Sequence, residues 1–163
     1  MNKVENHIEK TKERSPVVLW ILVFLLFLIG LAALISGPML FLAPDGHLLQ
    51  WSVSMLEGTP FANFLVPGVI LFLLIGIFPV FVGYGLLKKP FWRWPDRINP
   101  LKQYHWSFSA SWAVGIIILI WIITETVLLG YISVLQPIVG AWGVTLIILT
   151  LLPPIRRYCR RYS

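Results

Sequence analysis

Four long apolar runs alternate with polar segments along this chain. Only the third run contains a charged side chain, and the runs cover residues 17–36, 64–87, 106–129 and 138–152. A helix needs about 20 apolar residues to cross the hydrocarbon core of a bilayer. The pattern therefore predicts an all-α integral membrane protein, in which a domain at 16–158 contains four transmembrane helices at 17–36, 61–87, 104–129 and 137–155.

The basic residues of the chain are unevenly placed between these runs. All 13 Lys and Arg residues lie before the first run, between the second and third runs, or after the fourth. Loops rich in Lys and Arg remain in the cytoplasm, so both termini are expected there. We therefore predict a cytoplasmic tail at 1–15, a basic cytoplasmic tail at 159–163, and contact between the basic segments and anionic lipid headgroups.

A polar residue followed by proline precedes each predicted helix, at Ser15-Pro16, Thr59-Pro60, Asn99-Pro100 and Gln136-Pro137. Proline is tolerated in the first helical turn, and a preceding Ser, Thr or Asn can cap it. The third helix is then expected to begin near Pro100, whereas the start of the fourth stays open. Pro67 and Pro79 predict a bend in the second helix, and Pro153-Pro154 a stop or bend in the fourth.

The outward segment between the first two helices has a pattern of its own. Asp45 is placed to cap a helix whose apolar positions are Leu48, Leu49, Trp51, Met55 and Leu56, before Gly58 ends it. This spacing predicts an amphipathic helix in the outer interface. A lid folded over the mouth of the bundle would use the same apolar face.

Small residues recur on two of the predicted spans. Ser107, Ser111 and Gly115 follow one another every four residues on the third helix, and Gly68, Gly76 and Gly83 share one face of the second. Small side chains let neighbouring helices approach closely in a membrane. We expect contact between these two helices, or between each of them and a neighbouring chain.

Glu125 is the one ionisable residue within a predicted span. A carboxylate at that depth is a functional-site candidate by default, although Gln136, Tyr131 or a backbone group would also satisfy it as a structural hydrogen-bonding residue. Asp45, His47 and Glu57 add acidic and imidazole groups on the outer side. Their spacing matches no metal motif, and we predict no metal site.

The loop between the second and third helices combines cations with aromatic residues. Trp and Tyr concentrate at the headgroup level of membranes, where Lys and Arg bind anionic lipid. We therefore assign Trp92, Arg93, Trp94 and Tyr104 to the lipid interface, with a protein-binding loop as the alternative.

The residues needed by several enzyme classes are missing. The three histidines lie in the N-terminal tail, the outer loop and the inner border of the third helix, outside the apolar runs. The single cysteine (Cys159) leaves no thiol pair, and neither GxSxG nor HExxH occurs. The net charge of +6 is accounted for by membrane topology rather than nucleic-acid binding. We predict a non-enzymatic protein without cofactor.

The stretch 56–68, which reads LEGTPFANFLVPG, and the later Leu135-Gln136-Pro137 resemble a group of small, uncharacterised bacterial membrane proteins with four helices. That group has a Ser/Thr-Pro-Phe-x-Asp-Phe/Tyr-Leu-x-Pro-Gly pattern, from which this chain departs at Asn63. The resemblance implies a multi-pass protein of the bacterial inner membrane and brings no established activity with it.

Three functions fit these patterns. The leading interpretation is a protein that acts by association, either as an accessory subunit of a membrane complex or as a homo-oligomer. The second is a small proton- or cation-coupled transporter or channel that uses Glu125. The third is a binder of lipid or another hydrophobic ligand, with the outer segment as its lid.

Overall fold

A computed structural model of the protein describes residues 16–161, and these residues form helices and turns without a β-strand. The predicted tail at 1–15 and the last two residues of the predicted tail at 159–163 lie outside the described residues. Three helices are long and apolar enough to cross a membrane: α2 (Val17–Leu42), the continuous α3–η3–α4 helix (Leu65–Lys88) and α6 (Trp106–Leu129). A fourth span results if α7 (Leu135–Leu151) and α8 (Pro153–Cys159), which meet at 62°, count as one.

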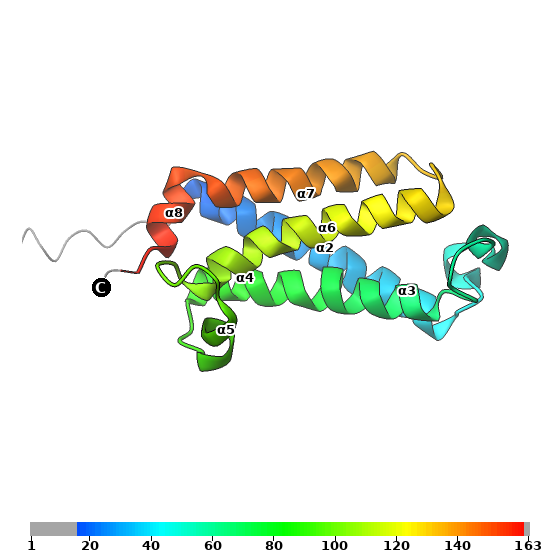
Figure 1. The fold of residues 1–163 in the computed structure, drawn as a ribbon, viewed down its shortest axis with the longest axis horizontal. Helices are drawn as coiled ribbons and strands as arrows, with labels where there is room; N and C mark the ends of the chain where they lie inside the picture. Colours follow the sequence, from blue (N-terminus) through cyan, green and yellow to red (C-terminus); the bar gives the residue numbers. More distant parts are fainter. Residues whose placement is uncertain (1–15, 162–163) are drawn as a thin grey trace, which may run out of the picture.

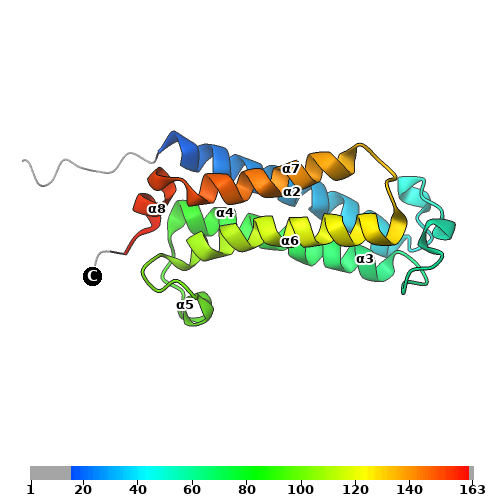
Figure 2. The ribbon, with the colours of Figure 1, turned by 45° about the horizontal axis from the view of Figure 1, so that its top comes forward.

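The long helices form two antiparallel pairs that lie side by side (Figures 1 and 2). The first pair is α2 with the α3–η3–α4 helix, and the second is α6 with α7. The main hydrophobic core joins the pairs through residues such as Leu22, Val82, Ile118 and Leu146. All eight buried residues of α6 lie between Trp106 and Ile118, so the pairs pack most tightly in that half of the molecule.

One end of the bundle, here called the basic end, holds every described Lys and Arg. It is formed by the end of α4, the short helix α5 (Arg93–Ile98), the start of α6 and α8. The opposite end holds the connection between α2 and α3 and the turn between α6 and α7. Figure 1 shows that α2 also begins at the basic end, where α8 lies. A chain that begins and ends on the same side of a membrane crosses it an even number of times.

Several predicted helix boundaries were wrong. The first helix runs six residues beyond position 36 and includes Pro38. The second begins at Leu65 rather than at residue 61, because the Asn63 side chain accepts a hydrogen bond from the Leu65 N–H (3.1 Å) and ends the preceding turn there. The third begins at Trp106 rather than near Pro100, with His105 accepting a hydrogen bond from the Ser107 N–H (3.4 Å) as its cap.

The fourth predicted helix is divided in two. α7 begins at Leu135, so Pro137 lies in its first turn and does not kink it. Pro153 and Pro154 then form the first turn of α8, where a missing N–H costs no helical hydrogen bond. The expected stop or bend at these prolines is confirmed.

The second helix stays continuous across both of its prolines. Pro67 falls in the first turn of α3 (Leu65–Ile70), where its lack of an N–H is harmless. Pro79 follows a π-helical stretch, η3 (Leu71–Ile77), in which the Phe78 N–H donates to the Leu73 carbonyl five residues back. In this wider turn each N–H bonds a carbonyl five residues back instead of four. The change comes just before Pro79, which has no N–H to donate, at the start of α4 (Phe78–Lys88).

The predicted amphipathic helix of the outer segment is not a continuous helix. Two short 3₁₀ turns replace it, η1 (His47–Leu49) and η2 (Val53–Leu56), separated where Gln50 takes a left-handed backbone (φ 57°). Leu56 packs with Leu40 and Phe64 in a second small core, against which Leu129 of α6 also lies. The segment thus packs against the ends of α2, α3 and α6.

Candidate functional site at the two ends of the bundle

The glycine stripe of the second helix faces α2, not the third helix. A Cβ at Gly68 would lie 2.7 Å from Leu40 Cβ, one at Gly76 would lie 3.1 Å from Leu34, and one at Gly83 would lie 3.1 Å from Phe27. Gly30 and Gly37 of α2 complete the same contact from the other side: a Cβ at Gly37 would lie 2.8 Å from Phe72. The second and third helices do contact each other, as predicted, but this stripe does not form that contact.

The stripe on the third helix is buried against other partners. Gly115 meets α7, where a Cβ on it would lie 2.5 Å from Ile147 Cγ1 and 2.8 Å from the Gly143 carbonyl. Ser107 and Ser111 are both fully buried, and the Ser111 hydroxyl donates to the Ser107 carbonyl (2.9 Å). Contact between α4 and α6 comes instead from the Trp106 ring, which covers Gly85.

Glu125 is half-buried near the opposite end and is held by two neutral donors. The Trp121 indole donates to one carboxylate oxygen (3.0 Å), and the Gln136 amide donates to the other (3.4 Å). Gln136 is buried and also binds the turn between α6 and α7, by donating to the Gly130 carbonyl (3.1 Å) and accepting from the Ile132 N–H (3.0 Å). The predicted pairing of Glu125 with Gln136 is confirmed, and it ties the tip of the α6–α7 hairpin together.

The outer acidic residues do not gather into one site. Asp45 contacts His47 at 2.6 Å, and these hydrogen bonds lower the pKa of the Asp45 carboxyl. Both side chains are exposed, as is Glu57. Within residues 16–161, His, Cys, Asp and Glu form no group of three or more suited to hold a metal ion.

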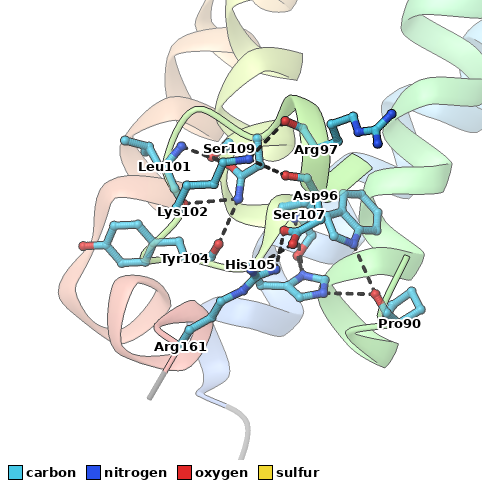
Figure 3. Close-up of polar contacts among 12 residues, drawn as sticks. Pro90, Asp96, Arg97, Leu101, Lys102, Tyr104, His105, Ser107, Ser109 and Arg161 are labelled. Atoms are coloured by element: carbon cyan, nitrogen blue, oxygen red, sulfur yellow. Dashed lines mark hydrogen bonds and ion pairs between the residues drawn. The ribbon is translucent and has the colours of Figure 1, made fainter. Parts of the chain in front are cut away.

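A network that the sequence did not reveal organises the basic end (Figure 3). Asn99 is buried between α5 and α6, and its amide nitrogen donates to the carbonyls of Leu101 (3.1 Å) and Tyr104 (2.9 Å). Its oxygen accepts from the Ser109 hydroxyl (2.7 Å) and the Leu101 N–H (3.2 Å). Asn99 therefore fixes the loop onto α6. Its position before Pro100 had predicted a helix cap instead, and that prediction is wrong.

His105 lies at the start of α6 and is almost fully buried. Its Nε2 faces the Pro90 carbonyl (3.2 Å), which can only accept, so Nε2 carries the hydrogen and Nδ1 (2.8 Å from the Ser107 hydroxyl) accepts. Burial is the main cause that lowers the pKa of His105, and the nearby cations Arg161 and Lys89 add to it. The neutral ring is therefore the form that this site stabilises.

The α8 segment is attached to the same network. Arg161 pairs with Asp96 of α5 through its two terminal guanidinium nitrogens, and this pairing lowers the pKa of the Asp96 carboxyl. The Arg161 N–H donates to the Gln103 carbonyl (2.9 Å), and the His105 N–H donates to the Cys159 carbonyl (2.8 Å). Lys102 donates to the last carbonyls of α5, those of Asp96 (2.7 Å) and Arg97 (3.0 Å). The loop, α5 and α8 thus form one connected layer.

The four residues assigned to the lipid interface divide into two groups. Trp92 stacks on Phe81 (5.2 Å between ring centroids) and Trp106 (5.8 Å), and Tyr104 stacks on Phe108 (4.4 Å), so both are part of the packed layer. Arg93 and Trp94 are exposed on α5. Three exposed apolar residues beside them, Phe91, Ile98 and Leu101, were not singled out in the sequence because α5 itself was not predicted.

No family model matches the chain, and neither the curated proteins nor the solved structures include a match to it. The resemblance to small four-helix bacterial membrane proteins therefore stays a prediction.

Proposed function

We propose that this chain is a non-enzymatic integral membrane protein that acts by association, as an accessory subunit of a membrane complex or as a homo-oligomer. The observation that carries the proposal concerns the interior of the bundle. Within the described residues, every buried side-chain nitrogen and oxygen has a hydrogen-bond partner. The glycines between paired helices are likewise in close contact, so the interior is used for its own packing, and the surfaces are what remains for function.

The outer face of α7 is the surface that fits a further helix best. α7 packs chiefly on α6, and it leaves Ala141 and Thr145 exposed one turn apart. A Cβ at the neighbouring Gly140 would meet only Ile122, at 3.8 Å. Small residues on an open face allow close approach of another transmembrane helix.

Native mass spectrometry of the protein, extracted gently from its host membrane, tests this proposal. We expect an assembly of fixed stoichiometry that contains either other subunits or further copies of the chain. Replacing Ala141 and Thr145 by Leu should weaken this assembly about fivefold or more, because overpacking a close interface costs ~1–3 kcal/mol.

The matched control replaces Ala32 and Ser36 of α2 by Leu. The Ser36 hydroxyl donates to the carbonyl of the exposed Ala32, just as the Thr145 hydroxyl donates to that of Ala141. These variants should leave the assembly intact. A monomer extracted without partners would contradict the proposal, and an assembly lost only in the α2 variants would contradict the choice of α7.

Transport is the second candidate, and Glu125 favours it. Its carboxyl group lies within α6 and contacts two neutral donors, with no Lys or Arg among its described partners. This function predicts that Glu125→Gln abolishes pH-dependent ion flux through reconstituted protein. Flux that persists in the variant, or is missing from the parent protein, would contradict it. Binding of a lipid or other hydrophobic ligand under the outer segment stays a prediction without a supporting contact.

We further infer that the basic end faces the cytoplasm of a bacterial cell. All nine described Lys and Arg residues lie at that end, which supports the inference. Among the described residues of the opposite end, the groups that can carry a charge near neutral pH are carboxylates and His47.

A further inference from the structure

α5 buries Pro95 and places Asp96 against the protein, and it leaves two large apolar side chains exposed. Asn99, just after the helix, is buried, and Asp96 pairs with Arg161. Trp94 and Ile98, one turn apart on α5, are 63% and 73% exposed. A loop helix that packs on its own protein normally buries its apolar face. The exposed pair of Trp94 and Ile98 is therefore suited to an apolar environment outside this chain.

The position of α5 identifies that environment. Figures 1 and 2 both show α5 projecting sideways from the basic end, beyond the outline of the bundle. The Trp94 ring stacks on Phe81 (5.8 Å between centroids), and Phe81 belongs to the membrane-spanning part of α4. Tyr84, one turn further along α4, is 45% exposed on that helix and stacks on Trp92. The apolar face of α5 is therefore continuous with a span surface that faces lipid.

Charge selects the kind of lipid. Arg93 and Arg97 are exposed and one turn apart on α5, next to Trp94 and Ile98. Arginine binds phosphate through paired N–H donors, and aromatic residues settle at the boundary between headgroups and acyl chains. We propose that α5, with Phe91 before it and Leu101 after it, is a binding surface for anionic phospholipid. The apolar side chains enter the acyl boundary, and the two arginines bind the headgroup phosphate.

Depth-dependent fluorescence quenching tests this surface in the intact chain. Ile98→Cys is labelled with an environment-sensitive fluorophore and reconstituted into vesicles of phosphatidylcholine, with or without an equal amount of phosphatidylglycerol. The native thiol, Cys159, is buried and does not compete for the label. We expect quenching by brominated acyl chains, stronger when phosphatidylglycerol carries the bromine than when phosphatidylcholine does.

Replacing Arg93 and Arg97 by Gln should reduce this preference for phosphatidylglycerol by up to about 25-fold, because each cation near an anionic surface contributes about fivefold in affinity. The matched control is Arg156→Gln with Arg157→Gln on α8, two exposed adjacent arginines, which should leave the preference unchanged. Quenching by aqueous iodide instead of by brominated lipid would overturn the proposal. Protection from both quenchers in the vesicles would overturn it too, because protein, such as a second copy of this chain, would then cover α5.

Discussion

His105 couples the start of α6 to the loop after α4 and is held in its neutral form. Its ring has Pro90 on one side and Ser107 on the other, and Lys89, Arg161 and Asp96 are the charged groups that act on it. Protonation would place a second hydrogen on Nδ1, where the Ser107 N–H now donates. A charged ring here would also lie near two cations.

The stability of the protein should therefore depend on His105 below neutral pH. The unfolded chain takes up the proton near pH 6.5, and the folded chain resists it because its pKa is lower. Stability is then full above about pH 6.5 and falls as the pH decreases below it, by at most about 1.4 kcal/mol per pH unit for one proton.

Thermal unfolding in detergent between pH 8 and pH 5 measures this effect. His105→Gln should flatten the decline, whereas His47→Gln, at an exposed site, should not. Asp96, whose pKa is lowered, loses its contribution only as the pH falls below about 3.8, so it does not confound this range. An equal slope in the parent protein and in His105→Gln would refute the role of His105.

At the scale of helices, close glycine contacts set how the two pairs are built. Gly115 and Gly143 face each other between α6 and α7, whereas Gly140 on the same helix faces open space apart from Ile122. The three glycines thus offer a comparison within one helix pair between close contact and free surface.

Gly115→Ala should lower the free energy of unfolding by about 1–3 kcal/mol, because its new methyl group would meet the backbone carbonyl of Gly143. Gly140→Ala should leave stability unchanged or raise it by up to about 1 kcal/mol through helix propensity. Chemical unfolding of both variants in one detergent makes the comparison. Equal losses in the two variants would show that the α6–α7 contact is looser than described.

The sequence predicted where the long helices lie along the chain better than which helices pack against each other. Apolar runs and prolines located the ends of the spans to within six residues, because both act locally. Which helix meets Gly68 or Gly115 depends on how the spans are arranged around each other, and periodicity carries no information on that. α5 was missed because its apolar face is short and Pro95 interrupts its sequence, and the roles of Asn99 and Arg161 depend on contacts between distant segments. The Glu125–Gln136 contact was predictable because both residues flank one short turn.

For the whole molecule, the arrangement of the two ends supports four crossings of the bilayer, with α7 and α8 as the last, bent span. α7 alone has 17 residues and is shorter than the other spans. The proposals for association through α7 and for lipid binding by α5 both require this topology, with the basic end in the cytoplasm.

Cysteine accessibility at four exposed positions tests this topology most directly. Glu57 lies in the connection between α2 and α3 and Tyr131 in the turn between α6 and α7, both at the opposite end. Arg97 lies on α5 and Arg157 on α8, both at the basic end. Each is replaced by Cys singly and treated with a membrane-impermeant maleimide in intact cells, and the parent protein, whose Cys159 is buried, serves as the blank. We predict labelling of Glu57→Cys and Tyr131→Cys from outside, and of Arg97→Cys and Arg157→Cys only after permeabilisation. Labelling of Tyr131→Cys and Arg157→Cys from the same side would contradict the fourth crossing and the account built on it.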